Sequence, residues 1–563
     1  MSMMVLGYFV LFSVIVAAIT YFKTKEGNLE SSDGYFLGGR SLTGKVIAGS
    51  LLLTNLSAVS FVGMSAQSYE VNMSVMGWEV GSGITLILVA ILLLPKYLKQ
   101  GITTIPDFIE SRFDSGTRKF ITILFLISYI VNMLPITLYS GAVAMSQIFD
   151  VSAIFGITYA QGIWIMVWVI GIIGSLYAIF GGLKAVAISD SINGIALVIG
   201  GLLVPVFALI YMGDGSISQG FEVFLTSTPE KFNAIGSNSD PLPIGTMFSG
   251  LLLVNLYYWG TDQSIIQRGL GAKNLKEGQK GVIYAGLLKV LTPLMVIIPG
   301  IMAFQIFGGG IDNVDTVYPM LVNTVLPKPL VGLFAAAMMG AILSTFNSVL
   351  NSASTLYALN VYKPKWGAGK TDVQLVNAGK IFGTVIAVIA MVGAPFIMYA
   401  PKGLFDYLQT INGFFNVPIF TIIFMGYMTK KVPALAAKIG ITFFVSVYAI
   451  TQLVWDTGIH YLYISAILFV LTCIIMYVIG KIKPMDKEFV LEDKELVDVE
   501  PWHNRFKFSG FVVFVMVGMY IIFSDLGLAR EGKLDLVSLI AFVVLGVICT
   551  VGTILLDKIF NKK

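Results

Sequence analysis

Apolar runs of about 20 residues, separated by short polar loops, make up most of the chain, and a run of this length spans a bilayer as an α-helix. The pattern predicts fifteen such spans and an all-α polytopic membrane protein that forms a single transmembrane domain over residues 1–563. The expected spans are 3–22, 44–66, 78–98, 118–147, 158–182, 186–212, 243–262, 280–307, 329–361, 376–399, 403–427, 432–454, 460–482, 507–524 and 534–557.

Lys and Arg are concentrated in the loops that follow the odd-numbered spans. Cytoplasmic loops of membrane proteins carry an excess of these residues. The alternation therefore predicts a protein of the inner, or plasma, membrane with its N-terminus outside and its C-terminus in the cytoplasm. A charged cytoplasmic linker, 483–506, follows the thirteenth span and is expected to be mobile.

Composition agrees with this class and excludes several others. Hydrophobic residues make up 56% of the chain and charged residues 12%, compared with about 25% charged residues in soluble domains. The net charge of +4 is spread over loops, so the lipid bilayer is an expected partner and nucleic acid is not. Both cysteines, Cys473 and Cys549, lie in apolar runs, which argues against a disulfide framework. The sequence shows no nucleophile–base pair, metal-ligand cluster or phosphate loop, so no enzyme is expected.

A polar cluster interrupts the second span, in the stretch 50–64 (SLLLTNLSAVSFVGM). Irregular backbone at membrane depth occurs where it is buried in protein or lines a cavity, and broken helices near the midplane form binding sites in transporters. The interrupting side chains are Thr54, Asn55, Ser57 and Ser60. The stretch therefore predicts a binding site.

The seventh span is interrupted in a similar way by small and polar residues, among them Asn255 and Gly260. Five spans separate the starts of the two interrupted segments, so the two segments run in opposite directions across the membrane. This arrangement predicts an inverted repeat of 44–212 against 243–427, with an extra N-terminal helix, 3–22, and additional C-terminal helices, 432–557.

Few charged residues fall inside the apolar runs, and each is a candidate functional residue because a charge at membrane depth is costly. These residues are Glu79, Asp190, Asp262 and Lys289. Lys289 lies well inside its span and is expected to have a buried partner. Asp262 is placed to pair with Arg268 in a structural role. The ninth span adds a face rich in hydroxyl and amide groups between 340 and 355, where Ser344 and Thr345 could supply oxygens to a sodium ion.

Several long motifs, in this order, resemble the sodium/glucose branch of the solute:sodium symporter family, in its bacterial form. They are YFLGGRSL (35–42), TNLSAVSFVGMSAQSY (54–69), TIPDFIESRF (104–113), GGLKAVAISDSINGIALVIGGL (181–202), NLYYWGTDQSIIQRGLGAKNLKEGQKG (255–281) and AILSTFNSVLNSASTLYALNVYK (341–363). The resemblance implies a LeuT-type fold with a five-plus-five inverted-repeat core and sodium-driven uptake of a small solute by alternating access.

The resemblance also implies roles for single residues. Sodium, the co-transported ion, would be held by Leu53, Leu56, Ala341, Ser344 and Thr345, with Asp190 on its route to the cytoplasm. Tyr258 would be the inner gate that stacks on a sugar ring. The solute would be held by Asn55, Ser57, Glu79, Ser82, Asn255, Tyr258, Lys289 and Gln409, to which the polar cluster adds Ser60.

Three positions depart from the sugar-carrying relatives. Val59 and Ser60 stand where those relatives often have a Glu-Gln pair, and Trp78 stands where a relative has tyrosine. A sugar remains the favoured solute, and an inositol, a sialic acid or amino sugar, an organic acid or a vitamin remains open. A membrane sensor that uses the linker 483–506 to meet a partner is a weaker alternative, because no kinase or DNA-binding domain is attached.

Overall fold

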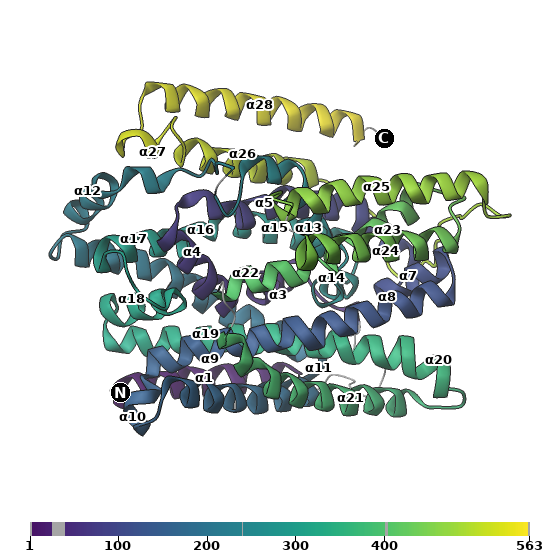
Figure 1. Cartoon of the computed structure of the whole chain (residues 1–563), viewed down its shortest axis with the longest axis horizontal. Coiled ribbons are helices and arrows are strands. Elements are labelled where there is room, and N and C mark those ends of the chain that lie inside the picture. Colours follow the sequence, from purple (N-terminus) through teal and green to yellow (C-terminus); the bar gives the residue numbers. More distant parts are fainter. Residues whose placement is uncertain (1–2, 25–39, 239, 400–402, 456, 561–563) are drawn as a thin grey trace.

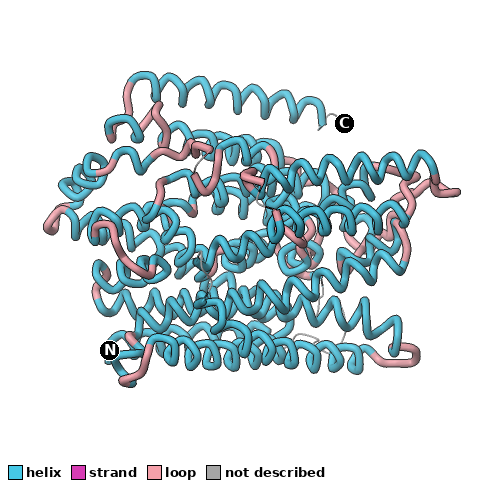
Figure 2. Tube along the Cα trace, viewed as in Figure 1, coloured by secondary structure: helices cyan, strands magenta, loops and turns pink. Residues whose placement is uncertain are grey.

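The protein is a bundle of helices whose axes lie roughly side by side (Figure 1; Figure 2). The computed structural model describes residues 3–24, 40–238, 240–399, 403–455 and 457–560, and the side chains of all of these except 178–187 and 403–407. Residues 35–39 of the first family motif lie outside the described residues. Within the described part of the chain there is no β-strand, and a single parallel bridge joins Leu42 to Ala272.

The longer helices, in chain order, are α1 (Met3–Thr24), α3 (Gly44–Asn55), α5 (Gly77–Leu88), α8 (Ser115–Ser128), α9 (Leu134–Phe149), α11 (Tyr159–Met212), α13 (Gly250–Gly260), α15 (Leu275–Leu291), α17 (Ile298–Phe307), α19 (Lys328–Leu356), α21 (Asp372–Gly393), α22 (Gly403–Asn412), α23 (Asn416–Met428), α24 (Ala434–Ala449), α25 (Tyr461–Ile482), α26 (Arg505–Ile522) and α28 (Leu536–Phe560). Shorter helices that matter below are α4 (Ser65–Glu70), α6 (Leu94–Gln100), α7 (Ile105–Arg112) and α14 (Gln263–Leu270).

Thirteen helical segments of the described chain are long and apolar enough to cross a membrane, or fourteen if one bent pair counts as a span. This agrees with the prediction of a polytopic all-α protein, although the predicted number was fifteen. When the bent pair is counted, the remaining difference lies at 243–262, which is divided at Ser249 between a 3-10 turn (Ile244–Phe248) and α13. At 1.5 Å per residue, α13 is about 16 Å long and too short to span a bilayer by itself.

The predicted interruption of the second span is present. Helix α3 ends at Asn55, a π-helical turn (Ser60–Met64) leads into α4, and the two halves of the span are bent by 56°. The second interrupted segment is divided at Ser249, and Thr261 and Asp262 separate α13 from α14 at its end. Asn255, which was expected to interrupt it, lies inside the continuous α13.

Helix α11 differs from the expected pair of spans 158–182 and 186–212. The helix is continuous from Tyr159 to Met212. Two stretches within it, Tyr159–Tyr177 and Ile188–Met212, are each long and apolar enough to cross a membrane. The side chain of Lys184, which was expected in a cytoplasmic loop, lies outside the described side chains.

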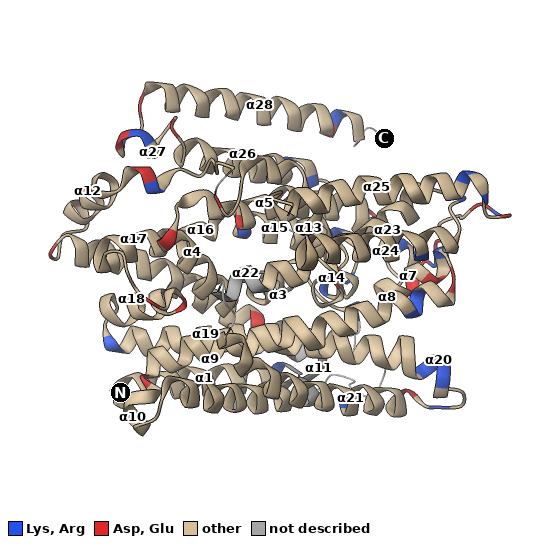
Figure 3. Ribbon diagram, in the orientation of Figure 1, with Lys and Arg blue, Asp and Glu red and all other residues tan. Residues whose placement is uncertain are grey.

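Helix α19 lies at the centre of one half of the bundle and packs against α1, α9 and α11, whereas α15 packs against α3 and α5 in the other half. Helices α26 and α28 form a peripheral pair at one edge (Figure 1). Lys and Arg gather at the end of the bundle that holds α7 and the end of α25, and the N-terminus lies at the opposite end (Figure 3). The centre of the molecule is thus built around the first broken helix, between α15 and α19.

The linker 483–506 differs from the expected mobile segment, because it is an extended strap held by backbone hydrogen bonds. The backbone amide of Lys494 donates to the backbone carbonyl of Lys99 at 2.9 Å. The backbone amide of Leu275 donates to the backbone carbonyl of Asp498 at 2.9 Å. The Trp502 backbone donates to the Gln279 side chain at 2.7 Å, and the Trp502 side chain is buried. Apolar side chains between the charged residues anchor this strap to α6 and α15. They follow no periodic pattern that could be recognised in the sequence.

Candidate functional site

A cavity of about 130 Å³ lies beside the break in the first broken helix. Its wall includes eight of the nine residues that the sequence assigned to the solute: Asn55, Ser57, Ser60, Glu79, Ser82, Asn255, Tyr258 and Gln409. They come from the break itself, α5, α13 and α22. Segments far apart in the sequence therefore meet at one polar cavity.

The ninth residue, Lys289, lies directly behind this wall. Its ammonium group donates hydrogen bonds to the side chains of Asn55 and Glu79, and Lys289 and Glu79 are both buried. Thr292, one turn further along, also donates to the Glu79 carboxylate. Lys289 was expected to have a buried partner, and that partner is Glu79. The two residues neutralise each other's charge.

The polar side of the cavity retains hydrogen-bonding capacity. Ser82 donates to the Asn255 carbonyl oxygen at 3.3 Å, while the Asn255 amide nitrogen has no partner among the described residues. Tyr258 is hydrogen-bonded to Asn55. The hydroxyl group of a solute can thus accept a hydrogen bond from the Asn255 amide. The Tyr258 ring lies beside Asn255.

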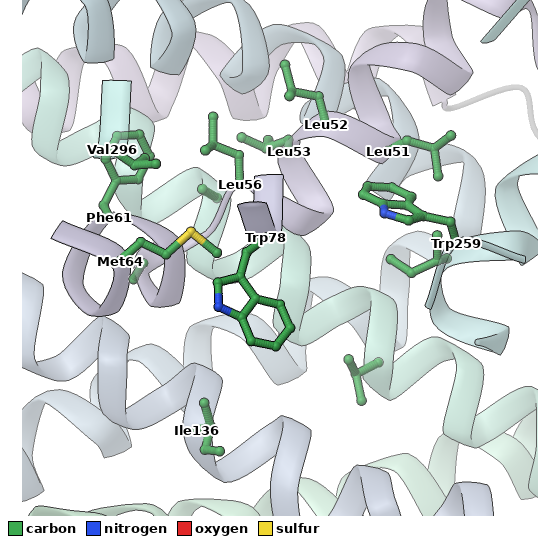
Figure 4. Packing of buried hydrophobic residues seen from close by; sticks show 14 of the residues in the cluster. Leu51, Leu52, Leu53, Leu56, Phe61, Met64, Trp78, Ile136, Trp259 and Val296 are labelled. Atoms are coloured by element: carbon green, nitrogen blue, oxygen red, sulfur yellow. The ribbon is translucent and has the colours of Figure 1, made fainter. Parts of the chain in front are cut away.

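Apolar side chains also line the cavity. Trp78, Met64 and Ile136 line it, and Figure 4 shows these side chains around the break, with Leu56, Phe61 and Val296 packed behind. Aromatic rings and amide groups in the lining of one cavity suit a solute with both C–H faces and hydroxyl groups.

Sequence reasoning missed several lining residues, among them the polar residues Thr137, Asn412 and Asn416. Asn412 accepts a hydrogen bond from the Asn132 amide at 2.8 Å. Asn412 lies three residues after Gln409 and Asn416 seven residues after it, so a helical face drawn through Gln409 could have found both.

Two of the expected sodium ligands, Ser344 and Thr345, contact the end of α3 at Thr54, beside the cavity. Thr345 donates to the Thr54 carbonyl at 2.8 Å, and the hydroxyls of Thr54 and Ser344 are 3.5 Å apart. Leu53 of α3, Leu56 in the break and Ala341 of α19 are all fully buried.

The break explains why backbone oxygens are free there. The Ser57 amide donates to the Asn55 carbonyl at 2.9 Å, and the Ser60 amide donates to the Ser57 carbonyl at 3.0 Å. Neither amide therefore bonds the carbonyl four residues earlier, on Leu53 or Leu56, as it would in a helix. Carbonyls released from helical hydrogen bonds, together with two hydroxyls, are neutral oxygens of the kind that sodium sites use in broken-helix transporters.

Asp190 lies close to this set. Its Oδ2 accepts a hydrogen bond from Ser50 at 2.8 Å and lies 3.6 Å from the Arg268 guanidinium, with both charged side chains 1% exposed. The expected pairing of Arg268 with Asp262 is not found. Asp262 instead accepts from Tyr129 at 2.9 Å and Tyr257 at 3.2 Å, because α14 turns the Arg268 side chain towards α3 and α11.

Comparisons with known proteins add to this geometry. The model of the family described as "Sodium:solute symporter family" matches residues 35–443. The chain is 47% identical over 519 residues to "Uncharacterized symporter YidK" of Escherichia coli (strain K12), covering 92% of this chain and 91% of that protein. It is 33% identical over 442 residues to the sodium/glucose cotransporter of Vibrio parahaemolyticus, covering 74% and 79%.

Solved structures are similar at the level of the fold. A Na+-coupled sialic acid symporter in a substrate-bound outward-open state aligns with a TM-score of 0.70 at 20% identity, covering 86% of this chain and 98% of that one. The nucleobase-cation-symport-1 family transporter Mhp1 in a closed conformation aligns with a TM-score of 0.54 at 14% identity, covering 82% and 98%. These neighbours confirm the predicted LeuT-type fold.

Proposed function

Because the chain belongs to the sodium:solute symporter family, we propose that it imports a small neutral polyhydroxylated solute, a sugar or polyol, together with sodium by alternating access. The observation that carries this proposal is the cavity at the break, whose lining combines amide, hydroxyl and carboxylate groups with the aromatic rings of Trp78 and Tyr258. Lys289 holds Asn55 and Glu79 in place, and Tyr258 is the inner gate. The solute is contacted by Asn55, Ser57, Ser60, Glu79, Ser82, Asn255 and Gln409.

The charges around the cavity favour a neutral solute over an acid. The described residues of the wall include two carboxylates, on Glu79 and Asp262, and no Lys, Arg or His. Lys289 compensates Glu79, and the hydroxyls of Tyr129 and Tyr257 bind Asp262. A carboxylate solute would therefore find no unpaired cationic side chain in the described wall of the cavity. Burying its charge there would cost free energy. This disfavours sialic acids and other organic acids among the open alternatives.

We assign sodium to the carbonyls of Leu53, Leu56 and Ala341 and the hydroxyls of Ser344 and Thr345, with Asp190 on its route. Sodium bound there would hold the broken helix to α19, next to the cavity wall at Asn55. Moving one sodium ion down 100 mV releases about 2.3 kcal/mol, and about 1.4 kcal/mol is a tenfold ratio, so one ion supports roughly fiftyfold accumulation.

The same proposal includes a membrane topology. The inverted repeat comprises 44–212 and 243–427, and the basic end of the bundle faces the cytoplasm (Figure 3). The N-terminus is then outside and the C-terminus inside the plasma membrane.

A thermal-shift screen of the purified protein tests the proposal. The panel is D-glucose, D-galactose, myo-inositol, glucosamine, N-acetylneuraminate and gluconate, each in sodium and in potassium. A ligand that binds the folded state raises the melting temperature. We expect a neutral sugar or polyol to stabilise the protein in sodium only. Stabilisation by gluconate or N-acetylneuraminate alone would overturn the neutral-solute proposal, and the absence of any sodium effect would overturn the ion assignment.

A further inference from the structure

A second cavity lies at the edge of the bundle, between α26 and α28. Its volume is about 460 Å³, compared with about 130 Å³ for the solute cavity. Both helices are long and apolar enough to cross a membrane, and α28 packs on the rest of the molecule mainly through α26 (Figure 1). Only two residues of α28, Ser538 and Leu545, are buried. The cavity is therefore a groove between two peripheral spans, open to the hydrocarbon of the bilayer.

The groove covers about half the depth of the membrane. One end is formed by Lys507, two residues after α26 begins, and Asp557, three residues before α28 ends. The other end is formed by Phe514 and Gly546. Eleven residues separate Gly546 from Asp557. They extend about 16 Å at 1.5 Å per residue, whereas the hydrocarbon core is about 30 Å thick. The groove thus belongs to one leaflet.

The charged end of the groove faces the side that we propose to be cytoplasmic. The C-terminal end of α28 points to the end of the bundle where Lys and Arg gather (Figure 3). Lys507 is exposed there, and it forms no ion pair with a carboxylate of the described chain. A lysine near the end of a span carries its ammonium group to the level of the lipid headgroups. Lys507 is therefore placed to bind a phosphate at that level.

The walls between the two ends suit an apolar occupant. They are formed by Gly510, Phe511, Cys549, Thr550, Thr553 and Ile554. The Thr550 hydroxyl donates to the Gly546 carbonyl at 2.7 Å, and the Thr553 hydroxyl donates to the Cys549 carbonyl at 2.7 Å. Because both hydroxyl hydrogens are used within α28, neither needs a partner in the groove. The hydrocarbon core contains no water, so these walls fit a chain of CH₂ groups.

We propose that this groove is a binding site for one phosphatidylethanolamine molecule of the cytoplasmic leaflet. One acyl chain lies against Phe511 and Ile554, and the phosphate binds Lys507. The primary ammonium group of the lipid binds Asp557. Asp557 also interacts electrostatically with Arg505, and a carboxylate has room for more than one donor. Basic residues between membrane helices are known binding points for lipid headgroups.

The opposite charges of Lys507 and Asp557 favour this headgroup over two others. Phosphatidylcholine carries a quaternary ammonium group, which has no N–H to donate to Asp557. Phosphatidylglycerol has no cation at all. A second copy of this chain is a poorer occupant, because one of its helices would cross both leaflets and the groove covers one. The occupant that fits has a zwitterionic head and an apolar tail.

Native mass spectrometry of the purified protein tests the headgroup, with the three lipids added at equal concentration. We expect each wild-type chain to retain one phosphatidylethanolamine in preference to the others. Lys507→Gln should weaken the binding of all three lipids about fivefold, because a basic residue near the membrane surface contributes about 1 kcal/mol. Asp557→Asn should remove the preference for phosphatidylethanolamine. Lys558→Gln, which changes an exposed neighbour outside the groove, is the matched control and should bind as the wild type does.

Filling the groove tests the acyl-chain site. A Cβ atom at Gly546 would lie 3.6 Å from the Phe514 ring, so Gly546→Phe places a ring inside the groove without a clash at Cβ. This variant should retain no phosphatidylethanolamine, and the lipid should no longer raise its melting temperature. Gly552→Phe is the control on the same helix, because a Cβ atom there meets nothing within 4 Å and Gly552 does not line the groove.

Three results would overturn the lipid site. They are equal retention of the three lipids by the wild type, retention of phosphatidylethanolamine by Gly546→Phe, and a wild-type dimer that Gly546→Phe dissociates. The last result would identify a second copy of the chain as the occupant. These measurements involve neither the solute nor sodium, so a failure of the proposed symport would leave the lipid site standing, and the reverse also holds.

Discussion

Lys289 and Glu79 form an ion pair in which the side chains are 1% and 2% exposed. Removing one partner of such a buried pair leaves an unpaired charge and costs about 3–5 kcal/mol, whereas replacing both partners is far less costly. Lys289→Met should therefore lower the melting temperature of the protein. The double variant Glu79→Gln/Lys289→Met should recover most of that stability.

Uptake separates the structural role of this pair from its functional role. Neither variant should transport, because the double variant restores folding without restoring the charges that orient Asn55 and the solute. Melting temperature and sodium-driven uptake are measured on the same preparations. Normal uptake by the double variant would make the pair structural only.

The sodium site can be tested through its two hydroxyls. Ser344→Ala/Thr345→Ala removes two of the five proposed ligands, and we expect the sodium concentration for half-maximal effect to rise at least about tenfold, which corresponds to about 1.4 kcal/mol. Ser354→Ala is the control, because Ser354 is a buried hydroxyl of α19 that packs near Gly383, away from the break. An unchanged sodium requirement in the double variant would contradict the assignment.

The outer half of the broken helix is held in place by close packing on Gly300. A Cβ atom at Gly300 would lie 2.1 Å from the Ser68 hydroxyl and 2.3 Å from the Ser65 carbonyl. Gly300→Ala should therefore push α4 away from α17 and cost about 1–3 kcal/mol, as overpacking typically does. Gly393→Ala, where a Cβ atom would meet nothing within 4 Å, should leave stability unchanged. Equal melting temperatures for the two variants would show that α4 tolerates displacement.

Much of the fold could be predicted from hydropathy because the membrane imposes one strong rule, that spans are long and apolar. The same rule makes Asn55 and Lys289 stand out in the sequence, because a polar side chain inside a membrane span is unfavourable unless it has a buried partner or a function. The wall of the cavity was predictable to this extent. The family resemblance, in addition, identified Ser82 and Gln409, which composition alone does not distinguish.

What the sequence could not show is which distant side chains face each other. Arg268 lies closer in the chain to Asp262 than to Asp190, yet the direction of α14 pairs it with Asp190. The strap at 483–506 reads as a charged linker, and its anchoring depends on the position of Gln279 in another helix. Such pairings are set by tertiary packing, which a single sequence does not contain.

The coupling of solute to sodium is the central claim, and it can be measured in reverse. Purified protein is reconstituted into proteoliposomes without a sodium gradient, and an inward gradient of D-glucose, D-galactose or myo-inositol is imposed. Uptake of radioactive sodium is then followed. We predict that at least one of these solute gradients drives sodium inward although no sodium gradient is present. Ser344→Ala/Thr345→Ala should abolish this flux. Sodium uptake that is the same with and without every solute gradient would contradict sodium-coupled symport of a neutral polyhydroxylated solute.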